Sequence, residues 1–144
     1  MLTIRRLDIG EAQILIEGAA AKARELGIPM CIAVTDESGH LIKFDRMNGG
    51  KVSSISIAID KAATGAIARN GTHVYNQLCV PGIPTFGIHI TNGGHFSIIG
   101  GGLPVFVDGE IVGGIGVSSG TAEQDRVCAE AAIQHFHSVS GKKA

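Results

Sequence analysis

The amino-acid sequence predicts an α/β fold: a three-layer α/β/α sandwich in which helices cover both faces of a five-stranded, mainly antiparallel sheet. Apolar residues recur with a helical period in three separate segments, which indicates three amphipathic helices. Short turns rich in glycine or polar residues separate predicted strands, which favours hairpins and antiparallel pairing. The elements follow the order helix, two strands, helix, loop, three strands, helix.

The composition is that of one globular domain over residues 1–144. Hydrophobic residues make up 44% of the chain and charged residues 17%, which argues against disorder. The net charge is −1 and no basic stripe is present, so we expect no nucleic-acid partner. The sequence contains neither a membrane-length apolar run nor an N-terminal apolar signal core, so we expect a cytoplasmic protein without a membrane partner.

The first helix is predicted over residues 8–26. Asp8 can cap its N-terminus, with Glu11 at the third helical position, and Gly27 ends it. One face of this helix is apolar, so we expect that face to pack on the sheet.

Two strands are predicted next, over residues 30–35 and 40–46. Alternation places Arg46 at the end of the second strand, on the face that carries the bulky apolar side chains. At this position an arginine either extends to solvent or an acidic partner, or directs its guanidinium into a pocket suited to a carboxylate.

The second helix is predicted to begin at Ser53 or Ser54 and to end near Arg69. Lys61 lies at the edge of its predicted buried face. From there its amine can reach solvent along the apolar surface, or it can serve a ligand.

Residues 72–94 form the least regular region. Thr72 is predicted to cap a short helix through Leu78, and the prolines that follow predict a loop. A loop of this length inside a small domain is often functional. It carries candidate ligands at His73, His89 and, at its end, His95.

Three further strands are predicted over residues 96–99, 104–107 and 111–117. The last two form a hairpin around Asp108-Gly109, because a type I′ turn needs two residues with positive φ. Three glycines in the last strand indicate that something approaches its backbone closely: Gly113, Gly114 and Gly116.

The last helix is predicted over residues 121–137. Thr121 and Gln124 have the spacing of a capping box. A glycine-rich strand that leads into a helix N-terminus offers free N–H groups and a positive dipole end, so we expect this region to accept a carboxylate or another anion.

Several sequence patterns argue against a metal or nucleotide site. Cys31, Cys79 and Cys128 fit neither a disulfide framework nor a zinc site; the first and last are interpreted as core residues and Cys79 as a candidate exposed thiol. The six histidines show no zinc-binding spacing, and the glycine runs lack the residues of a phosphate loop or dinucleotide fingerprint.

The sequence resembles the GlcG/HbpS-like family, which includes the C-terminal domain of PduO-type proteins. The most specific match is Gly100–Pro104 together with Asp108–Ser118 and Asp125. Weaker matches occur in the same order over 33–41, 46–49 and 61–64. Two positions depart from the family pattern: Ser119 stands where glycine is usual, and Asn48 where aspartate is common.

The resemblance implies a profilin-like sandwich with a five-stranded antiparallel sheet that assembles into homo-oligomers. It also implies haem binding in several members and an association with glycolate, propanediol or glycerol catabolism. The adenosyltransferase activity of PduO-type proteins belongs to a separate domain.

The leading hypothesis is a haem- or tetrapyrrole-binding domain, which needs an axial imidazole and groups that bind the propionates. Candidate axial ligands are His95, His89 and His73. Candidate ligand-binding residues are Arg46, Lys61, His95, Gly100, Gly101, Gly102, Thr121 and Asp125.

Two alternatives remain open. A cofactor-free enzyme would transfer a proton next to a carbonyl: Arg46 would clamp a carboxylate, Lys61 or His95 would move the proton, and Gly101 and Gly102 would stabilise an enolate. An oligomeric accessory protein would instead use an exposed glycine-rich surface of its last strand to pack against another subunit.

Overall fold

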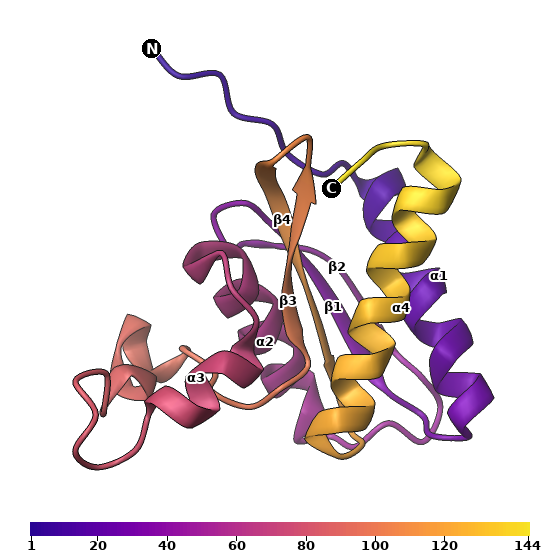
Figure 1. Ribbon diagram of the computed structural model, residues 1–144. Helices are drawn as coiled ribbons and strands as arrows, with labels where there is room; N and C mark the ends of the chain where they lie inside the picture. Colours follow the sequence, from indigo (N-terminus) through magenta and orange to yellow (C-terminus); the bar gives the residue numbers. More distant parts are fainter.

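The computed structural model describes residues 1–144 and has one mixed α/β body with a four-stranded antiparallel sheet (Figure 1). The strand order is β2-β1-β4-β3. The strands are β1 (Cys31–Asp36), β2 (Leu41–Arg46), β3 (Gly102–Val107) and β4 (Glu110–Ser118). The predicted fold class is confirmed, and each of these strands begins and ends within two residues of its predicted bounds.

The prediction of a fifth strand over residues 96–99 is wrong. This segment is irregular, because helix side chains rather than a neighbouring strand satisfy its backbone groups. The Ser97 N–H donates to Thr64 Oγ1 at 2.9 Å, and the Ile99 carbonyl accepts from Thr72 Oγ1 at 2.6 Å. Two helix threonines therefore hold the segment at the sheet edge without extending the sheet.

Helices cover both faces of the sheet, as predicted (Figure 1). The helices α1 (Ile9–Leu26) and α4 (Ala122–Ser140) pack side by side on one face, and α2 (Ser54–Ala68) covers the other. Capping boxes begin α1 at Asp8 and α4 at Thr121. The short α3 (Thr72–Leu78) begins after Gly71, so Thr72 is its first residue and not its cap, because the Thr72 hydroxyl is engaged with residues 99 and 102 instead.

The larger core lies between the sheet and the α1/α4 layer. It consists of buried aliphatic and aromatic side chains that include Leu15, Ile16, Ile32, Val34, Ile115, Val117 and Phe136. Strand β1 is buried on both faces, since Ile32 and Val34 face this core while Cys31 and Ala33 face α2. Burial of Cys31 and Cys128 agrees with the sequence interpretation.

Helix α2 packs with its backbone directly against the backbone of β4. A Cβ atom added at Gly116 would overlap the Ala58 carbonyl and the Ala62 amide, and one added at Gly114 would overlap the Ala62 carbonyl. The close approach predicted from the glycines is therefore confirmed: at Gly114 and Gly116 the approaching element is α2 of the same chain, and at Gly113 it is Thr35 of β1 and the Leu7 side chain. These glycines are buried, so the expected exposed glycine surface for another subunit is not formed.

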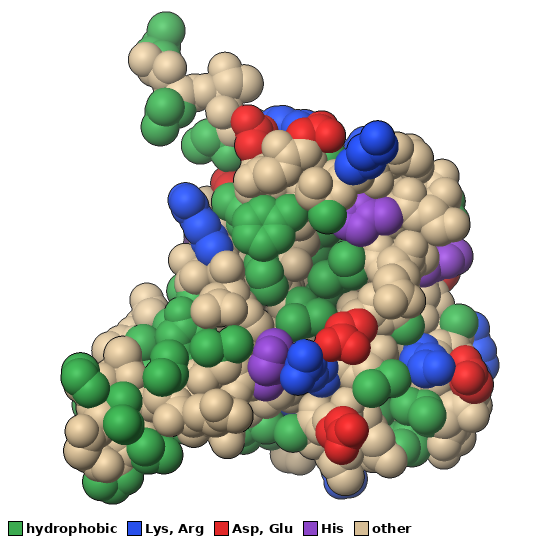
Figure 2. All heavy atoms as spheres, in the orientation of Figure 1, with side chains coloured by type: hydrophobic (Ala, Val, Ile, Leu, Met, Phe, Trp, Pro, Cys, Tyr) green, Lys and Arg blue, Asp and Glu red, His purple; other side chains and the backbone are tan.

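Residues 79–99, here called the arm, project from the body beside α3 (Figure 1). The arm contains two short 3₁₀ helices, η1 (Ile88–Ile90) and η2 (Asn92–Gly94). No aspartate, glutamate, lysine or arginine occurs anywhere from Asn70 to Val107. Figure 2 shows green, apolar side chains gathered over the arm. The exposed large apolar residues of the arm are Val80, Ile83, Phe86, Ile90 and Ile99.

None of the helices combines the length and the apolar character that crossing a membrane would require.

Candidate functional site

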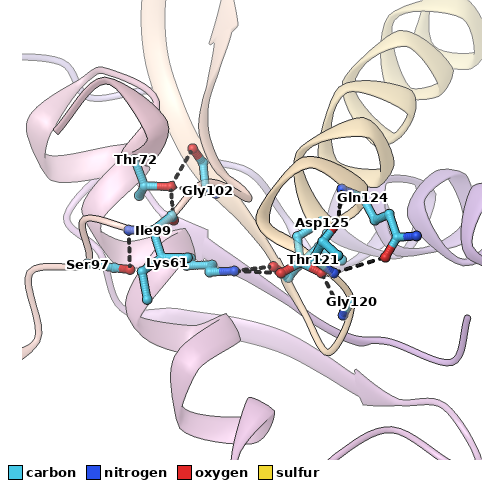
Figure 3. A network of polar contacts seen from close by, with 10 residues as sticks. Lys61, Thr72, Ser97, Ile99, Gly102, Gly120, Thr121, Gln124 and Asp125 are labelled. Atoms are coloured by element: carbon cyan, nitrogen blue, oxygen red, sulfur yellow. Dashed lines mark hydrogen bonds and ion pairs between the residues drawn. The ribbon is translucent and has the colours of Figure 1, made fainter. Parts of the chain in front are cut away.

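A buried ion pair joins α2 to α4 around one end of the sheet (Figure 3). Lys61 Nζ donates to Asp125 Oδ2 at 2.8 Å and to the Val117 carbonyl at 3.0 Å. The side chains of Lys61 and Asp125 are 1% and 3% exposed. The expectation that Lys61 extends along the apolar surface to solvent is therefore wrong, because its amine is enclosed by its own partners. A role of Lys61 toward a ligand stays a prediction.

Burial sets the electrostatics of this pair. Removal from water lowers the pKa of Lys61, while the hydrogen bond and the charge of Asp125 act in the opposite direction. The other carboxylate oxygen of Asp125 accepts the Gly120 N–H at 2.9 Å. Both charged groups therefore have their polar partners inside the protein, which is the condition for burying an ion pair.

The glycine turn before β3 encloses this ion pair. Gly101 has a φ of 125°, and a Cβ atom there would lie 2.8 Å from Asp125 Cβ and 3.0 Å from Lys61 Nζ. The Gly102 N–H donates to Thr72 Oγ1 at 2.9 Å. Thr121 Oγ1 accepts the Gln124 N–H at 3.2 Å, which completes the cap of α4. Of the glycines proposed as ligand-binding, Gly100 alone lines a cavity, described below.

Arg46 lies apart from these groups. It is exposed at the end of β2, where it lies opposite Cys31 of the neighbouring strand β1. Cys31 in turn lies opposite Ser118 of β4. Two strand spacings, about 10 Å, therefore separate Arg46 from β4. The structure does not bring Arg46 and Lys61 into one pocket, so the combined anion site expected from the sequence is not formed.

His73 lines a cavity of about 350 Å³ between α3 and the first turn of α4, and most of the residues that line it are polar. Its Nδ1 is sealed from solvent without a hydrogen-bond partner, because the ring lies against Gly71. Burial, and to a lesser degree the charge of Arg126, lower the pKa of His73. The other lining residues are Asn76, Gln77, Gly100, Ala122, Glu123 and Arg126.

His95 and His89 line a second groove of about 210 Å³ where the arm meets α2, and more of its lining residues are apolar. His95 Nδ1 lies 2.9 Å from Asp60 Oδ1, and the His95 side chain is 71% exposed. His89 Nδ1 lies 3.0 Å from Cys79 Sγ. Besides the two histidines and Asp60, the groove is lined by Gly94, Ser97 and four apolar residues: Ile57, Phe96, Ile98 and Ile99. The groove thus combines two imidazoles with an apolar wall.

Two residues of this region were not predicted from the sequence. Asp60 orients His95 although 35 residues separate them, and only its position as an acid within a mostly apolar helix distinguishes it. Cys79 was a candidate exposed thiol and is partly exposed in the structure, but its pairing with His89 depends on the path of the arm.

Comparisons with known proteins place this geometry in a family. The model of the family described as "Haem degrading protein HbpS-like" matches residues 7–134. A 15.0 kDa protein from the dhaT-dhaS intergenic region of Citrobacter freundii is 37% identical over 92% of this chain and 94% of its own length.

Two solved structures share the fold at high coverage. The Klebsiella pneumoniae protein ORFY superposes with a TM-score of 0.92 and is 32% identical, with 94% of each chain covered. The structure described as a PduOC:Heme complex superposes with a TM-score of 0.86 and is 28% identical, covering 90% of this chain and 94% of its own.

Proposed function

The chain belongs to the HbpS-like family, and on that premise we propose that it binds haem in the groove beside His95. The observation that carries the proposal is the contact between His95 Nδ1 and the Asp60 carboxylate. Imidazoles that ligate metals usually donate their second N–H to such an acceptor, which orients the ring and raises the basicity of the free nitrogen. With Nδ1 bound to Asp60, His95 presents Nε2 for coordination.

The lining of the groove fits a macrocycle better than a small anion. Ile57, Phe96 and Ile98 supply apolar contact, and no cationic side chain lines the groove. A groove of this volume takes one edge of a porphyrin, whose propionates would extend to solvent. This arrangement differs from the expectation that Arg46, Lys61 and the start of the last helix at Thr121 bind the propionates. When bound, haem would supply an iron centre for ligand or redox chemistry.

A hemin titration tests this proposal. We expect the purified chain to give a saturable Soret shift at one haem per chain, and the His95→Ala variant to lose it. Asp60→Asn should weaken binding by roughly 10–100-fold, because the ring loses its charged orienting partner.

His73→Ala is the matched control, because His73 lies in the other cavity and its loss should leave the titration unchanged. A saturable shift that survives in His95→Ala, or disappears in His73→Ala, would place the haem elsewhere. A Soret shift that never saturates in the wild-type chain would rule out a specific haem site. Homo-oligomer formation, a cytoplasmic location and a link to glycolate, propanediol or glycerol catabolism stay predictions.

A further inference from the structure

The arm holds a thiol–imidazole pair that the haem proposal leaves without a role. Cys79 Sγ lies 3.0 Å from His89 Nδ1, at hydrogen-bond distance. Cys79 follows the last residue of α3, and His89 lies within η1, so the fold of the arm brings together two residues ten positions apart. With its hydrogen on Nε2, the imidazole can take the thiol proton at Nδ1, which generates the nucleophilic thiolate.

The other two cysteines differ from Cys79 in access and in chemistry. Cys31 and Cys128 are fully buried, whereas Cys79 is partly exposed. Burial raises the pKa of the Cys31 thiol, and it raises the pKa of Cys128 to about 11. Neither buried thiol has an imidazole partner. The chain therefore contains one cysteine that is both accessible and paired with a proton acceptor.

We propose that Cys79 is a modification site that undergoes thiol–disulfide exchange with small uncharged disulfides. The Cys79 sulfur attacks one sulfur of the disulfide, and a new S–S bond forms as the old one breaks. His89 takes the proton of the Cys79 thiol and returns it to the departing sulfur. Cys79 ends in a mixed disulfide, one half of the reagent leaves as a thiol, and no other oxidant is needed.

The surroundings of the pair define the class of reagent. No aspartate, glutamate, lysine or arginine occurs between Asn70 and Val107, and the flanking residues Leu78 and Val80 are exposed and apolar. The one carboxylate that lines the groove beside His89 is Asp60, which is paired with His95. An uncharged, partly apolar disulfide therefore meets no electrostatic barrier and gains apolar contact as it approaches. This proposal goes beyond haem binding and does not depend on it.

The reaction of the reduced full-length chain with 4,4′-dithiodipyridine tests the proposal, because the released thiopyridone absorbs light and the adduct can be located by peptide mass spectrometry. We expect one fast-reacting thiol per chain, with the adduct on Cys79, and loss of the fast phase in Cys79→Ser. His89→Gln should slow the fast phase at least about tenfold, since glutamine cannot take the proton. The control is His40→Gln, because His40 is an exposed histidine in the hairpin turn before β2 and is 39 residues from Cys79 in the sequence. This variant should react at the wild-type rate.

A second variant at His89 distinguishes the loss of a proton acceptor from a change in the structure of the arm. In His89→Ala we expect slow reaction that added imidazole partly restores. An adduct that forms first on Cys31 or Cys128 would overturn the proposal, as would a wild-type rate in His89→Gln. All these readouts are made without haem, so their outcome is independent of the hemin titration.

Discussion

Gly116→Ala is expected to destabilise the fold by at least about 3 kcal/mol, at the upper end of what overpacking costs. The added methyl group would overlap the Ala58 carbonyl and the Ala62 amide, which are backbone atoms of α2. A flexible side chain could move aside, but here the whole helix must lift from the sheet. Denaturant unfolding followed by circular dichroism should show a much lower midpoint with little change in slope.

Gly10→Ala is the matched control for this prediction. Gly10 lies in the first turn of α1, where a Cβ atom would meet only the Asp8 side chain, at 3.3 Å. Because alanine favours helix over glycine, we expect this variant to be as stable as the wild type or up to about 1 kcal/mol more stable. Equal midpoints for Gly116→Ala and the wild type would mean that α2 does not rest on β4 as described.

Breaking the buried ion pair between Lys61 and Asp125 should lower the free energy of unfolding by a similar amount. Lys61→Met leaves the Asp125 carboxylate buried with only the Gly120 N–H as a partner, and Asp125→Asn leaves a buried ammonium facing a neutral amide. Loss of one member of a buried pair costs about 3–5 kcal/mol, because the remaining charge is uncompensated.

The double variant measures how much the two charged groups stabilise each other, apart from what each contributes alone. Lys61→Met combined with Asp125→Asn removes both charges and keeps an acceptor for the Gly120 N–H. We expect it to be more stable than the sum of the single effects predicts, by about 1–3 kcal/mol of coupling free energy. Strict additivity would show that the two groups do not stabilise each other.

The lowered pKa of Lys61 also predicts a pH dependence. Between its lowered folded pKa and the ordinary value of 10.5, the unfolded chain binds more protons than the folded chain at this residue. The free energy of unfolding should therefore rise with pH across that window. Lys61→Met should lack this contribution, so the difference in stability between it and the wild type should change with pH there. The comparison requires urea unfolding of both chains over an alkaline pH series.

Much of the fold could be predicted from local sequence. The capping boxes at Asp8 and Thr121 and the Asp108-Gly109 hairpin are decided by neighbouring residues, so their positions were predicted correctly. The fifth strand was not, because whether residues 96–99 pair as a strand depends on Thr64 and Thr72, which come from helices. The apolar pattern of this segment predicts that its backbone groups bond to a neighbouring strand, whereas in the structure they bond to threonine side chains of two helices.

The candidate site was less predictable for the same physical reason. The burial of Lys61 depends on Asp125, which lies 64 residues away, and a lysine at the edge of a helix face gives no local sign of such a partner. The separation of Arg46 from Lys61 follows from the strand order, which places β1 between β2 and β4. His95 was predicted as a candidate ligand, whereas its contact with Asp60 required the structure.

The packing of α1 against α4 has a consequence for how the chain is made. These two helices form one layer, and the entire sheet, α2 and α3 lie between them in sequence. Leu15 and Ile16 of α1 therefore leave the ribosome long before Cys128, Ala132 and Phe136 arrive to complete their core. Such distant pairing slows folding, and until α4 emerges the apolar face of α1 has only its contacts with the sheet, chiefly with β1 and β2, to cover it.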